Sequence, residues 1–459
     1  MILACGHGAD LCGAREQLNA GSATAVDLLA RSLDAAAAPA ARHVFLRRFD
    51  ILAQAQAQAI DALAAAGQPR PALAGLAVSV KDMFDVAGQP TTAGSVVLPE
   101  VACAEDATAV ARLRAHGAAL VGHTNQSEFA FSGVGLNPHH GTPANAATAA
   151  IDPVARIPGG STSGGAVSVA SGAAWAALGT DTGGSLRIPA ALHGLVGFKC
   201  TQRMVPREGC LPLAPTLDTV GAITHSVRDA ILLHEVLSAR PLRRRPRPLT
   251  GWRLALPTHL MLDGVDAPVA AAFARAVDVL RQAGASIEEI RLDPLDELAA
   301  LHADGGLAAA ESWAWHRARL TRDEAHYDPR VAARIRRGQA MAAADHIDLV
   351  HARRRWVERV EATVEPYDAL LSPTVPIVAP PLAPLLDDDA LFFATNALLL
   401  RNPSVVNFLD GCAITLPCQA PDKLPVGLML WAPAMADERL LGAALAVEAE
   451  LARVARREA

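Results

Sequence analysis

The chain has 459 residues, of which 51% are hydrophobic and 19% are charged, and its formal net charge is −6. A chain of this length can bury a large core, and the balance of residue types is typical of a globular protein rather than a disordered or fibrous one. The net negative charge disfavours nucleic acids and anionic membranes as partners. We therefore expect a globular protein with no nucleic-acid and no membrane partner.

Cysteine usage and the first residues indicate the compartment. The cysteines are odd in number, are scattered along the chain and form no Cys-x-x-Cys pair; they are Cys5, Cys12, Cys103, Cys200, Cys210, Cys412 and Cys418. This usage favours reduced, mostly buried thiols. Residues 1–13 lack the basic segment and the long apolar run of a secretory signal, so a cytoplasmic location is expected.

The uncharged stretch 157–180 is long enough to span a bilayer. Its many Gly, Ser and Thr residues make it too polar for a stable lone span. The stretch instead predicts a tight loop followed by a buried helix of small residues.

The first 70 residues are expected to be helical. Ser22 can cap one helix with an apolar side, and an alanine-rich segment continues to about Ala66. We expect these helices to pack outside the core.

From there on, strands and helices alternate. The apolar run 76–80 predicts a buried strand, and residues 118–121 predict the next. Between them, Asp106 can cap a helix that Gly117 ends.

The same order returns further along the chain. Asp266 precedes a helix with Pro268 in its first turn, and Gly284 closes that helix before a strand at Ile287. The alternation predicts an α/β fold around one large sheet.

Two stretches predict connections. Arginines and prolines alternate over residues 240–248, without the aromatic residues that a nucleic-acid site would carry, so an exposed connector is favoured. The Pro-rich, acidic stretch 373–389 is also expected to be a loop. We predict a single domain over residues 1–459, made up of an N-terminal helical region (1–70), a core (71–240) and a second half with a helical region and a C-terminal core segment (241–459).

Two glycine-rich turns, 159–165 and 179–184, lead to Ser161 and Ser185 respectively. Glycine allows the backbone to approach a ligand closely and to aim successive N–H groups into one concavity, as an oxyanion site requires. Familiar alternatives fail: no Gly-Lys-Ser/Thr phosphate loop, Gly-x-Ser-x-Gly elbow or Ser-x-x-Lys motif is present at these positions.

Lysine is a rare choice in this chain. Among 41 basic residues only Lys81, Lys199 and Lys423 are lysines. A lysine at the end of a predicted buried strand suggests a need for an amine that can lose its proton, which arginine cannot do. An ordinary strand-end cation remains the alternative for Lys81.

With these residues in hand, the sequence resembles the amidase signature family. The resemblance is carried by LAGLAVSVKDMFDVAGQPTTAGS (73–95), DATAVARLRAHGAALVGHTNQSEFA (106–130), PGGSTSGGAVSVASGAAWAALGTDTGGSLRIPAALHGLVGFK (158–199), LLSPTVPIVAP (370–380) and LPVGLMLWAPAMADERLLGAALAVEAEL (424–451). It extends over nearly the whole chain. It implies an amidase signature fold, a large mixed β-sheet flanked by helices on both faces.

The resemblance also implies roles for residues. By position, Lys81 falls on the family's catalytic base, Ser161 on its proton-relaying serine with a cis peptide bond, and Ser185 on its acyl-forming nucleophile. The implied oxyanion hole consists of the backbone N–H groups of Thr182, Gly183, Gly184 and Ser185. The implied reaction is hydrolysis of a carboxylic amide to carboxylate and ammonia or amine through a seryl acyl-enzyme, without metal or cofactor.

The chain departs from the family pattern at three places: Thr162 and Ser163 follow Ser161, and His123 and Cys200 stand where lysine and proline are common. None of these touches the three candidate catalytic residues. Spacing favours Ser161 as the relay, and Ser163 remains an alternative.

Other polar residues are assigned lesser roles. Asp181 and Arg187 are expected to brace the nucleophile turn or to contact substrate. His139 and His140 lie in a predicted loop, which disfavours a metal site. Phe129 is expected in the core rather than in a pocket wall, as is its neighbour Phe131.

The proposed base constrains its own environment. Lys81 must be neutral to accept a proton, which requires its pKa to fall from about 10.4 to about 7–8. Burial at a strand end can produce that shift. We therefore expect a dry site.

Two other functions remain open. One is the glutaminase or A-type subunit of a tRNA-dependent amidotransferase, which shares the three residues, although the segment 203–213 looks more like that of free amidases. The other is an inert binding protein on the same fold. The favoured interpretation is a monomer or homodimer acting on a small-molecule amide.

Overall fold

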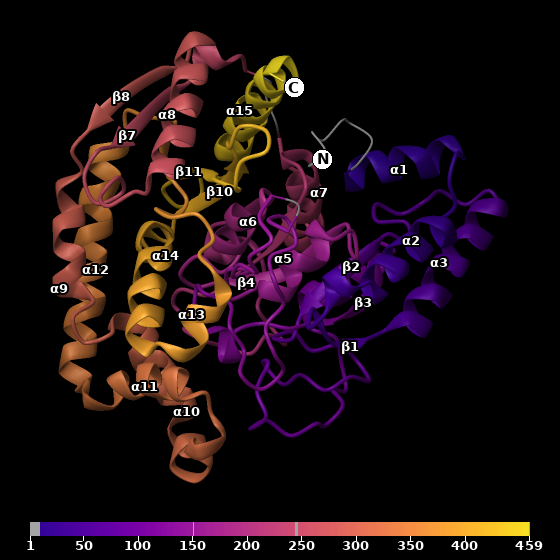
Figure 1. Cartoon of the computed structure of the whole chain (residues 1–459), viewed down its shortest axis with the longest axis horizontal. Helices are drawn as coiled ribbons and strands as arrows, with labels where there is room; N and C mark the ends of the chain where they lie inside the picture. Colours follow the sequence, from indigo (N-terminus) through magenta and orange to yellow (C-terminus); the bar gives the residue numbers. More distant parts are fainter. Residues whose placement is uncertain (1–9, 150, 244–246, 459) are drawn as a thin grey trace.

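The computed structural model describes residues 10–149, 151–243 and 247–458. One mixed sheet runs through the molecule, with strand order β1-β3-β2-β4-β6-β5-β10-β11-β9-β7-β8 (Figure 1). The strands are β1 (Phe45–Arg48), β2 (Ala77–Lys81), β3 (Ala119–Thr124), β4 (Ala176–Asp181), β5 (Val196–Lys199), β6 (Thr219–Thr224), β7 (Arg253–Pro257), β8 (Ser286–Ile290), β9 (Ala369–Pro373), β10 (Cys412–Pro417) and β11 (Gly427–Ala432).

Helices connect and cover these strands. They are α1 (Leu11–Ala20), α2 (Ala25–Ala37), α3 (Asp50–Ala65), α4 (Thr108–Ala115), α5 (Ser163–Ala170), α6 (Arg187–His193), α7 (Val227–Ser238), α8 (Ala267–Gln282), α9 (Leu298–Leu301), α10 (Gly306–Asp323), α11 (Pro329–Arg336), α12 (Ala343–Val364), α13 (Leu382–Asp387), α14 (Asp389–Leu409) and α15 (Asp437–Glu458). Single-turn 3₁₀ segments are η1 (Pro39–Ala41), η2 (Glu128–Ala130), η3 (Gln202–Met204), η4 (Leu249–Gly251), η5 (Asp293–Glu297), η6 (Glu324–His326) and η7 (Arg337–Ala340). The predicted α/β fold with a large mixed sheet and flanking helices is confirmed.

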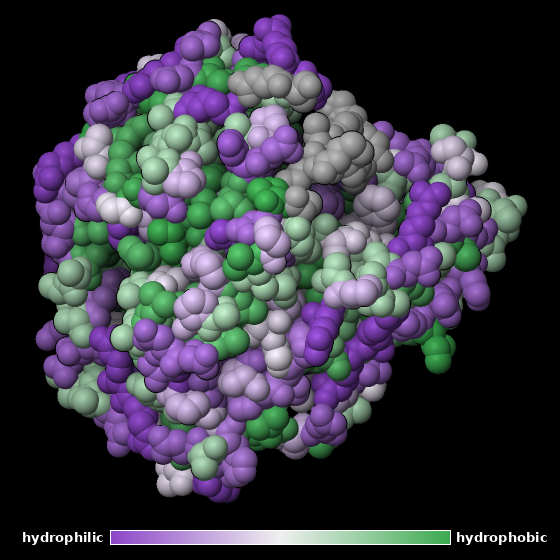
Figure 2. Space-filling view, viewed as in Figure 1, coloured by the Kyte–Doolittle hydropathy of each residue, from purple (hydrophilic) through white to green (hydrophobic). Residues whose placement is uncertain are grey.

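The sheet joins segments that are far apart in the sequence. β5 pairs antiparallel with β10, so strands from the first and second halves of the chain form one continuous sheet. α5, α6 and α14 form one chain of neighbouring helices on it, and α7, α15 and α8 form another. On the face shown in Figure 2, hydrophilic side chains dominate the outline and apolar ones gather nearer the middle.

Several local predictions are confirmed. The run ending at residue 80 forms β2, and the run 118–121 lies mostly within β3. Asp266 caps α8, where its carboxylate accepts from the Val269 N–H at 2.9 Å, and β8 follows Gly284.

The caps predicted at Ser22 and Asp106 are wrong. α2 is capped by Thr24, whose hydroxyl accepts from the Asp27 N–H, whereas Ser22 donates to a carbonyl at the end of α1. The Asp106 carboxylate accepts from the Ala87 N–H and pairs with Arg114, so α4 begins without a side-chain cap. Both residues make other contacts instead of capping the following helix.

Two further expectations need correction. The stretch 373–389 is not all loop, because α13 lies within it. The N-terminal helices do not lie outside the core, since Leu11 and Ala57 are fully buried in the main apolar cluster, and β1 interrupts the helical region. The predicted connector 240–248 falls partly on residues 244–246, outside the described residues.

The stretch 157–180 folds as a loop, the eight-residue helix α5 and most of β4. Within the described ranges, the structure contains no helix with the length and apolar character needed to cross a membrane.

The topology places the candidate site. β2 is parallel to β4, with Val80 opposite Leu178, so the carboxyl ends of both strands meet at one edge of the sheet. Lys81 ends β2 and Asp181 ends β4. Residues around position 81 therefore lie beside those around position 181.

Candidate active site

Lys81 is fully buried at the end of β2. Its Nζ donates to Ser161 Oγ at 2.7 Å and to Thr180 Oγ1 at 2.8 Å. Burial lowers the pKa of Lys81 to about 7, although the negative charges of Asp181 and Asp218 oppose the shift. An amine with this pKa exists in both protonation states near neutral pH.

Ser161 lies in the first glycine-rich turn, just before α5. The peptide bond between Gly160 and Ser161 is cis. Backbone crowding explains the glycine, because a Cβ at position 160 would lie 2.6 Å from the Ser132 carbonyl oxygen. Ser161 is fully buried, and its carbonyl accepts from the Ser127 N–H at 3.2 Å.

Ser185 lies in the second glycine-rich turn, between β4 and α6. The Thr162 N–H donates to the Ser185 carbonyl at 3.3 Å, which holds the two turns together. In the part of the chain that the structure describes, Ser185 Oγ makes no hydrogen bond, to Ser161 Oγ or to another group. Its hydroxyl is thus free to meet a ligand in the adjoining pocket.

The turn that carries Ser185 is braced by a buried ion pair. Arg187 Nη2 lies 2.9 Å from Asp181 Oδ1, and both side chains are fully buried. Burial raises the pKa of Asp181, but the charge and hydrogen bonds of Arg187 outweigh it and hold that pKa well below its usual range. The pair therefore stays ionised and structural, and neither residue lines the pocket next to Ser185.

Asn407, on α14, completes this brace. Its Nδ2 donates to the Asp181 carboxylate at 2.9 Å and to the Asp181 carbonyl at 3.0 Å, and its Oδ1 accepts from Arg187 at 2.6 Å. Sequence reasoning missed Asn407. It lies more than 200 residues from its partners, and the three asparagines of the largely apolar helix α14 form no recognisable motif.

The candidate oxyanion hole differs from the expectation at one residue. The Gly184 N–H donates to Asp181 Oδ1 at 2.9 Å, so this donor is already engaged. Among the described residues, the N–H groups of Thr182, Gly183 and Ser185 have no such partner. Gly184 is needed for shape instead: its φ is +127°, and an added Cβ would lie 2.6 Å from Pro403.

Thr182 is fixed from the other side of the turn. Its hydroxyl donates to Asp218 at 2.6 Å, and Asp218 also accepts from the N–H groups of Leu213 and Ala214. Burial raises the pKa of Asp218, and these hydrogen bonds oppose the rise. Asp218 is therefore a second residue that supports the turn.

A cavity of about 800 Å³ opens at Ser185. Thr182, Gly183 and Ser185 line it on one side, and mostly apolar side chains from α9, α10, α11 and α14 line the rest. Phe131 is buried in the main apolar cluster, as expected, and it also lines this cavity. Phe129 lies in the core as predicted, stacked on Tyr327 with ring centroids 5.4 Å apart.

The remaining candidates form structural contacts. His139 Nε2 lies 2.8 Å from Glu128 Oε1, and that hydrogen bond raises the pKa of His139. His123 lies 3.3 Å from Asp82, with both side chains fully buried. In residues 10–149, 151–243 and 247–458, no three His, Cys, Asp or Glu side chains are grouped as a metal site would require.

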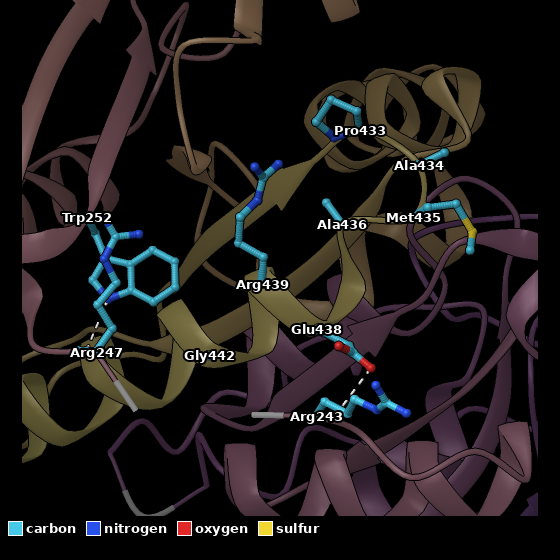
Figure 3. Close-up of a pocket in the computed structure, with 10 residues that line it drawn as sticks. All are labelled: Arg243, Arg247, Trp252, Pro433, Ala434, Met435, Ala436, Glu438, Arg439 and Gly442. Carbon is cyan, nitrogen blue, oxygen red and sulfur yellow. Dashed lines mark hydrogen bonds between the residues drawn. The ribbon is translucent and has the colours of Figure 1, made fainter. Parts of the chain in front are cut away.

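A second pocket, of about 820 Å³, is separate from this site (Figure 3). It lies where η4 meets the start of α15 and contains none of the residues discussed above; its lining includes Arg243, Arg247, Trp252, Glu438 and Arg439. Arg247 stacks over Trp252, 4.8 Å from the ring centroid, and its guanidinium also pairs with Asp368.

Comparison with known proteins identifies the family. The profile of the Amidase family matches residues 27–441. The chain is 37% identical over 403 residues to 2-amino-5-chloromuconic acid deaminase of Comamonas testosteroni, covering 86% of each protein. It is 35% identical over 475 residues to the A-type subunit of glutamyl-tRNA(Gln) amidotransferase of Roseiflexus sp. (strain RS-1), covering 95% of each.

Solved structures agree. A crystal structure of an amidase superposes with a TM-score of 0.86 at 32% identity, covering 96% of this chain and 99% of that one. Its fold is the amidase signature fold that the sequence predicted. The chain belongs to the Amidase family, whose members hydrolyse carbon–nitrogen bonds.

Proposed function

We propose that this protein hydrolyses a linear carboxylic amide through a seryl acyl-enzyme, with Ser185 as nucleophile, Ser161 as proton relay and Lys81 as base. The observation that carries the proposal is the 2.7 Å contact between Lys81 Nζ and Ser161 Oγ, made by a fully buried lysine whose pKa is about 7. A lysine kept only for its charge needs no such shift.

The first half-reaction moves two protons and forms one bond. With Lys81 neutral, the Ser161 hydroxyl donates to the Nζ lone pair, and Ser161 in turn takes the proton of Ser185. Ser185 Oγ attacks the amide carbon. The hydrogen bond from Ser185 Oγ to Ser161 Oγ forms when substrate binds, since catalytic hydrogen bonds are often long or absent without substrate.

The resulting oxyanion needs donors. Thr182, Gly183 and Ser185 present N–H groups that lack acceptors among the described residues beside the cavity, and the Asp181 and Asp218 contacts hold this backbone rigid. Such preorganised donors contribute about 3–4 kcal/mol each to transition-state stabilisation. We assign the hole to these three groups, without Gly184.

Acylation ends when the carbon–nitrogen bond breaks and the same path returns a proton to the departing amine. In the second half-reaction water attacks the Ser185 ester, and its proton passes through Ser161 to Lys81. The bond between the acyl carbon and Ser185 Oγ then breaks, and the proton returns from Lys81 through Ser161 to Ser185 Oγ, which restores the enzyme. The products are a carboxylate and ammonia or an amine. No step requires a metal or cofactor.

The test is direct detection of the acyl-enzyme. Rapid quench with an activated amide, followed by mass spectrometry, is expected to place the acyl group on Ser185. Ser185→Ala should remain folded and carry no adduct. An adduct on another residue, or turnover of amides by Ser185→Ala, would contradict the assignment.

A second candidate rests on the similarity to the A-type subunit of the amidotransferase. That function requires partner subunits, whereas we propose a monomer or homodimer that acts alone. Ammonia release from amides by the purified chain, with size-exclusion chromatography showing no other protein bound, would support our choice. An inert binding protein is distinguished by failure of a fluorophosphonate probe to label Ser185.

A further inference from the structure

The lining of the cavity over Ser185 is positively charged. Arg334, Arg337 and Arg401 line it, and its lining contains no Asp or Glu among the described residues. The remaining wall is mostly apolar. Arg337 is exposed, whereas Arg334 and Arg401 are partly buried. Buried charges are normally paired, so the buried N–H groups of these two arginines require acceptors.

Arg334 is the member of this group that most lacks a partner. Its Nη1 is buried without a hydrogen-bond acceptor, and no carboxylate of the described residues pairs with its guanidinium. Burial, and then the charge of Arg337, lower the pKa of Arg334 to about 10, which still leaves it protonated at neutral pH. Each such buried polar group requires an explanation.

Other arginines on α11 have acidic partners, so the lack of one is particular to Arg334. Arg330 pairs with Asp389 at 2.6 Å, and Arg336 pairs with Glu324. These two arginines face acids on the protein surface, whereas Arg334 faces the cavity. The outward-facing arginines of α11 are thus paired with carboxylates, whereas Arg334, which faces the cavity, has no carboxylate partner among the described residues.

Arg334 is held against Phe131, which lines the same cavity as Ser185. Its guanidinium carbon lies 5.2 Å from the ring centroid of Phe131, which also lines the cavity. The start of α11 is tied to the same segment, since the Asp328 N–H donates to Glu128 Oε2 at 2.8 Å. A planar cation stacked on an aromatic ring keeps its in-plane N–H groups available for an anion.

Arg401 adds to the positive charge from the opposite helix, α14. Its Nη1 donates to the Asp263 carbonyl at 2.6 Å and its Nε to Asn402, while Nη2 is buried and unpartnered among the described atoms. Arg337 donates to the Ala303 carbonyl at 2.7 Å. Arg401 also interacts with the charge of Asp263, and Arg337 is exposed to solvent, so Arg334 remains the member of this group with the least compensation.

The second pocket provides a contrast. It also contains three arginines, but Glu438 is part of its lining, and Arg247 pairs with Asp368 and stacks on Trp252 (Figure 3). Acids therefore lie in and beside that pocket. Buried guanidinium N–H groups without an acceptor, on Arg334 and Arg401, are found in the cavity that contains Ser185.

We propose that the substrate is an amide that carries a carboxylate at its far end, and that Arg334 binds this carboxylate while Ser185 attacks the amide carbon. The proposal rests on the function proposed above. A guanidinium offers two parallel N–H donors to a carboxylate, and such charge-assisted pairs are among the strongest hydrogen bonds available to a protein. The apolar wall fits a hydrocarbon spacer between the two ends. The product is then a dicarboxylate.

The test compares matched amides. The ω-carboxylated primary amides succinamate, glutaramate and adipamate would be assayed for ammonia release against butyramide, valeramide and hexanamide, in which a methyl group replaces the carboxylate. We expect the best carboxylated amide to exceed its neutral match at least about 100-fold in kcat/KM, as charge-assisted pairing at a buried site allows. In Arg334→Gln the ratio of kcat/KM for the carboxylated amide to that for its neutral match should fall below about 5. Arg334→Lys should recover part of this ratio, because lysine keeps the positive charge but lacks the two parallel N–H donors of the guanidinium. The matched control is Arg336→Gln on the same helix, whose ratio should stay at the wild-type value.

A binding measurement separates this inference from the catalytic one. Calorimetric titration of Ser185→Ala with succinate, glutarate and adipate is expected to show binding that weakens at least about 30-fold on adding Arg334→Gln and is unchanged by Arg336→Gln. Circular dichroism verifies the fold of each variant. A wild-type preference for the neutral amides, or dicarboxylate binding that is independent of Arg334, would overturn the inference even if Ser185 forms an acyl-enzyme. Conversely, Arg334-dependent binding without an acyl adduct would uphold this site and reject the proposed mechanism.

Discussion

Asp181 and Arg187 form a fully buried ion pair, with Arg187 Nη2 2.9 Å from Asp181 Oδ1, directly beneath the Ser185 turn. The same carboxylate accepts from the N–H groups of Gly184 and Leu186. The Asp181 side chain therefore fixes the backbone of the Ser185 turn up to the start of α6.

Replacing Arg187 with Met should destabilise the protein by about 3–5 kcal/mol, because it leaves the Asp181 carboxylate buried without its cation. Urea denaturation measures the loss. The matched control is Arg291→Met, since Arg291 pairs with Asp293 and Asp296 at an exposed site, where such pairs contribute about 0–1 kcal/mol. Equal effects of the two substitutions would show that the buried pair is not a structural brace.

Ser161→Ala should reduce kcat/KM nearly as much as Ser185→Ala, by about 10²–10⁴-fold, because it removes the hydroxyl through which Lys81 is proposed to act on the nucleophile. Ser163→Ala should retain most of the activity, since Ser163 Oγ is 3.5 Å from the Asn125 carbonyl and makes no hydrogen bond to Lys81 within the described contacts. Steady-state kinetics on one small amide compares all three variants. The reverse order for Ser161 and Ser163 would transfer the relay role to Ser163.

The pH dependence of stability gives a check on Lys81 that needs no substrate. The pKa of Lys81 is about 7 in the folded protein and 10.5 as an ordinary lysine. Between these values the unfolded chain holds a proton that the folded one has released, so the free energy of unfolding should rise with pH over this window. Below pH 7 both states are protonated, and the cost of burying the charge is fully present. Urea titrations of wild type and Lys81→Met between about pH 6 and 9 should therefore differ in slope, with the rise missing in the variant.

Local sequence was sufficient for the residues that lie in the two glycine-rich turns and at the end of β2. Lys81, Ser161 and Ser185 each lie in or beside a distinctive pattern. The strand β4 and its parallel pairing with β2 were not predicted, because the small residues of 157–180 suggested only a loop and a helix. Thr180 could have been suspected from its place at the start of the second turn. The four-residue strand β1 could not have been predicted from the sequence, because its pairing with β3 depends on tertiary contacts and not on a pattern in its own residues.

Residues supplied by distant helices left no such pattern. Asn407 and Arg334 reach the site from α14 and α11, and the cavity becomes visible only when those helices are placed over the turn. For Gly184, by contrast, the sequence suggested a role as a donor that the fold gives to another contact. The motif suggested four N–H donors, but the fold turns one of them inward to Asp181.

Lys81→Arg separates a base from a mere cation. Arginine preserves the positive charge but stays protonated at any usable pH, so it cannot accept a proton from Ser161. The variant should retain less than about 1% of wild-type kcat/KM, because loss of general-base assistance costs about 10²–10⁴-fold. Wild-type kcat/KM on a small amide should rise with pH and level off above a midpoint near 7, since only the deprotonated form of Lys81 is active and burial lowers its pKa to about 7.

Circular dichroism and fluorophosphonate labelling of Ser185 show whether the arginine variant is folded and whether its nucleophile remains accessible. If Lys81 only stabilised negative charge, a guanidinium in the same place would serve in part, and the pH profile of the variant would be flat at a substantial rate. A folded Lys81→Arg protein that keeps about a tenth or more of the wild-type rate would therefore show that Lys81 acts through its charge, and the general-base role would have to be abandoned.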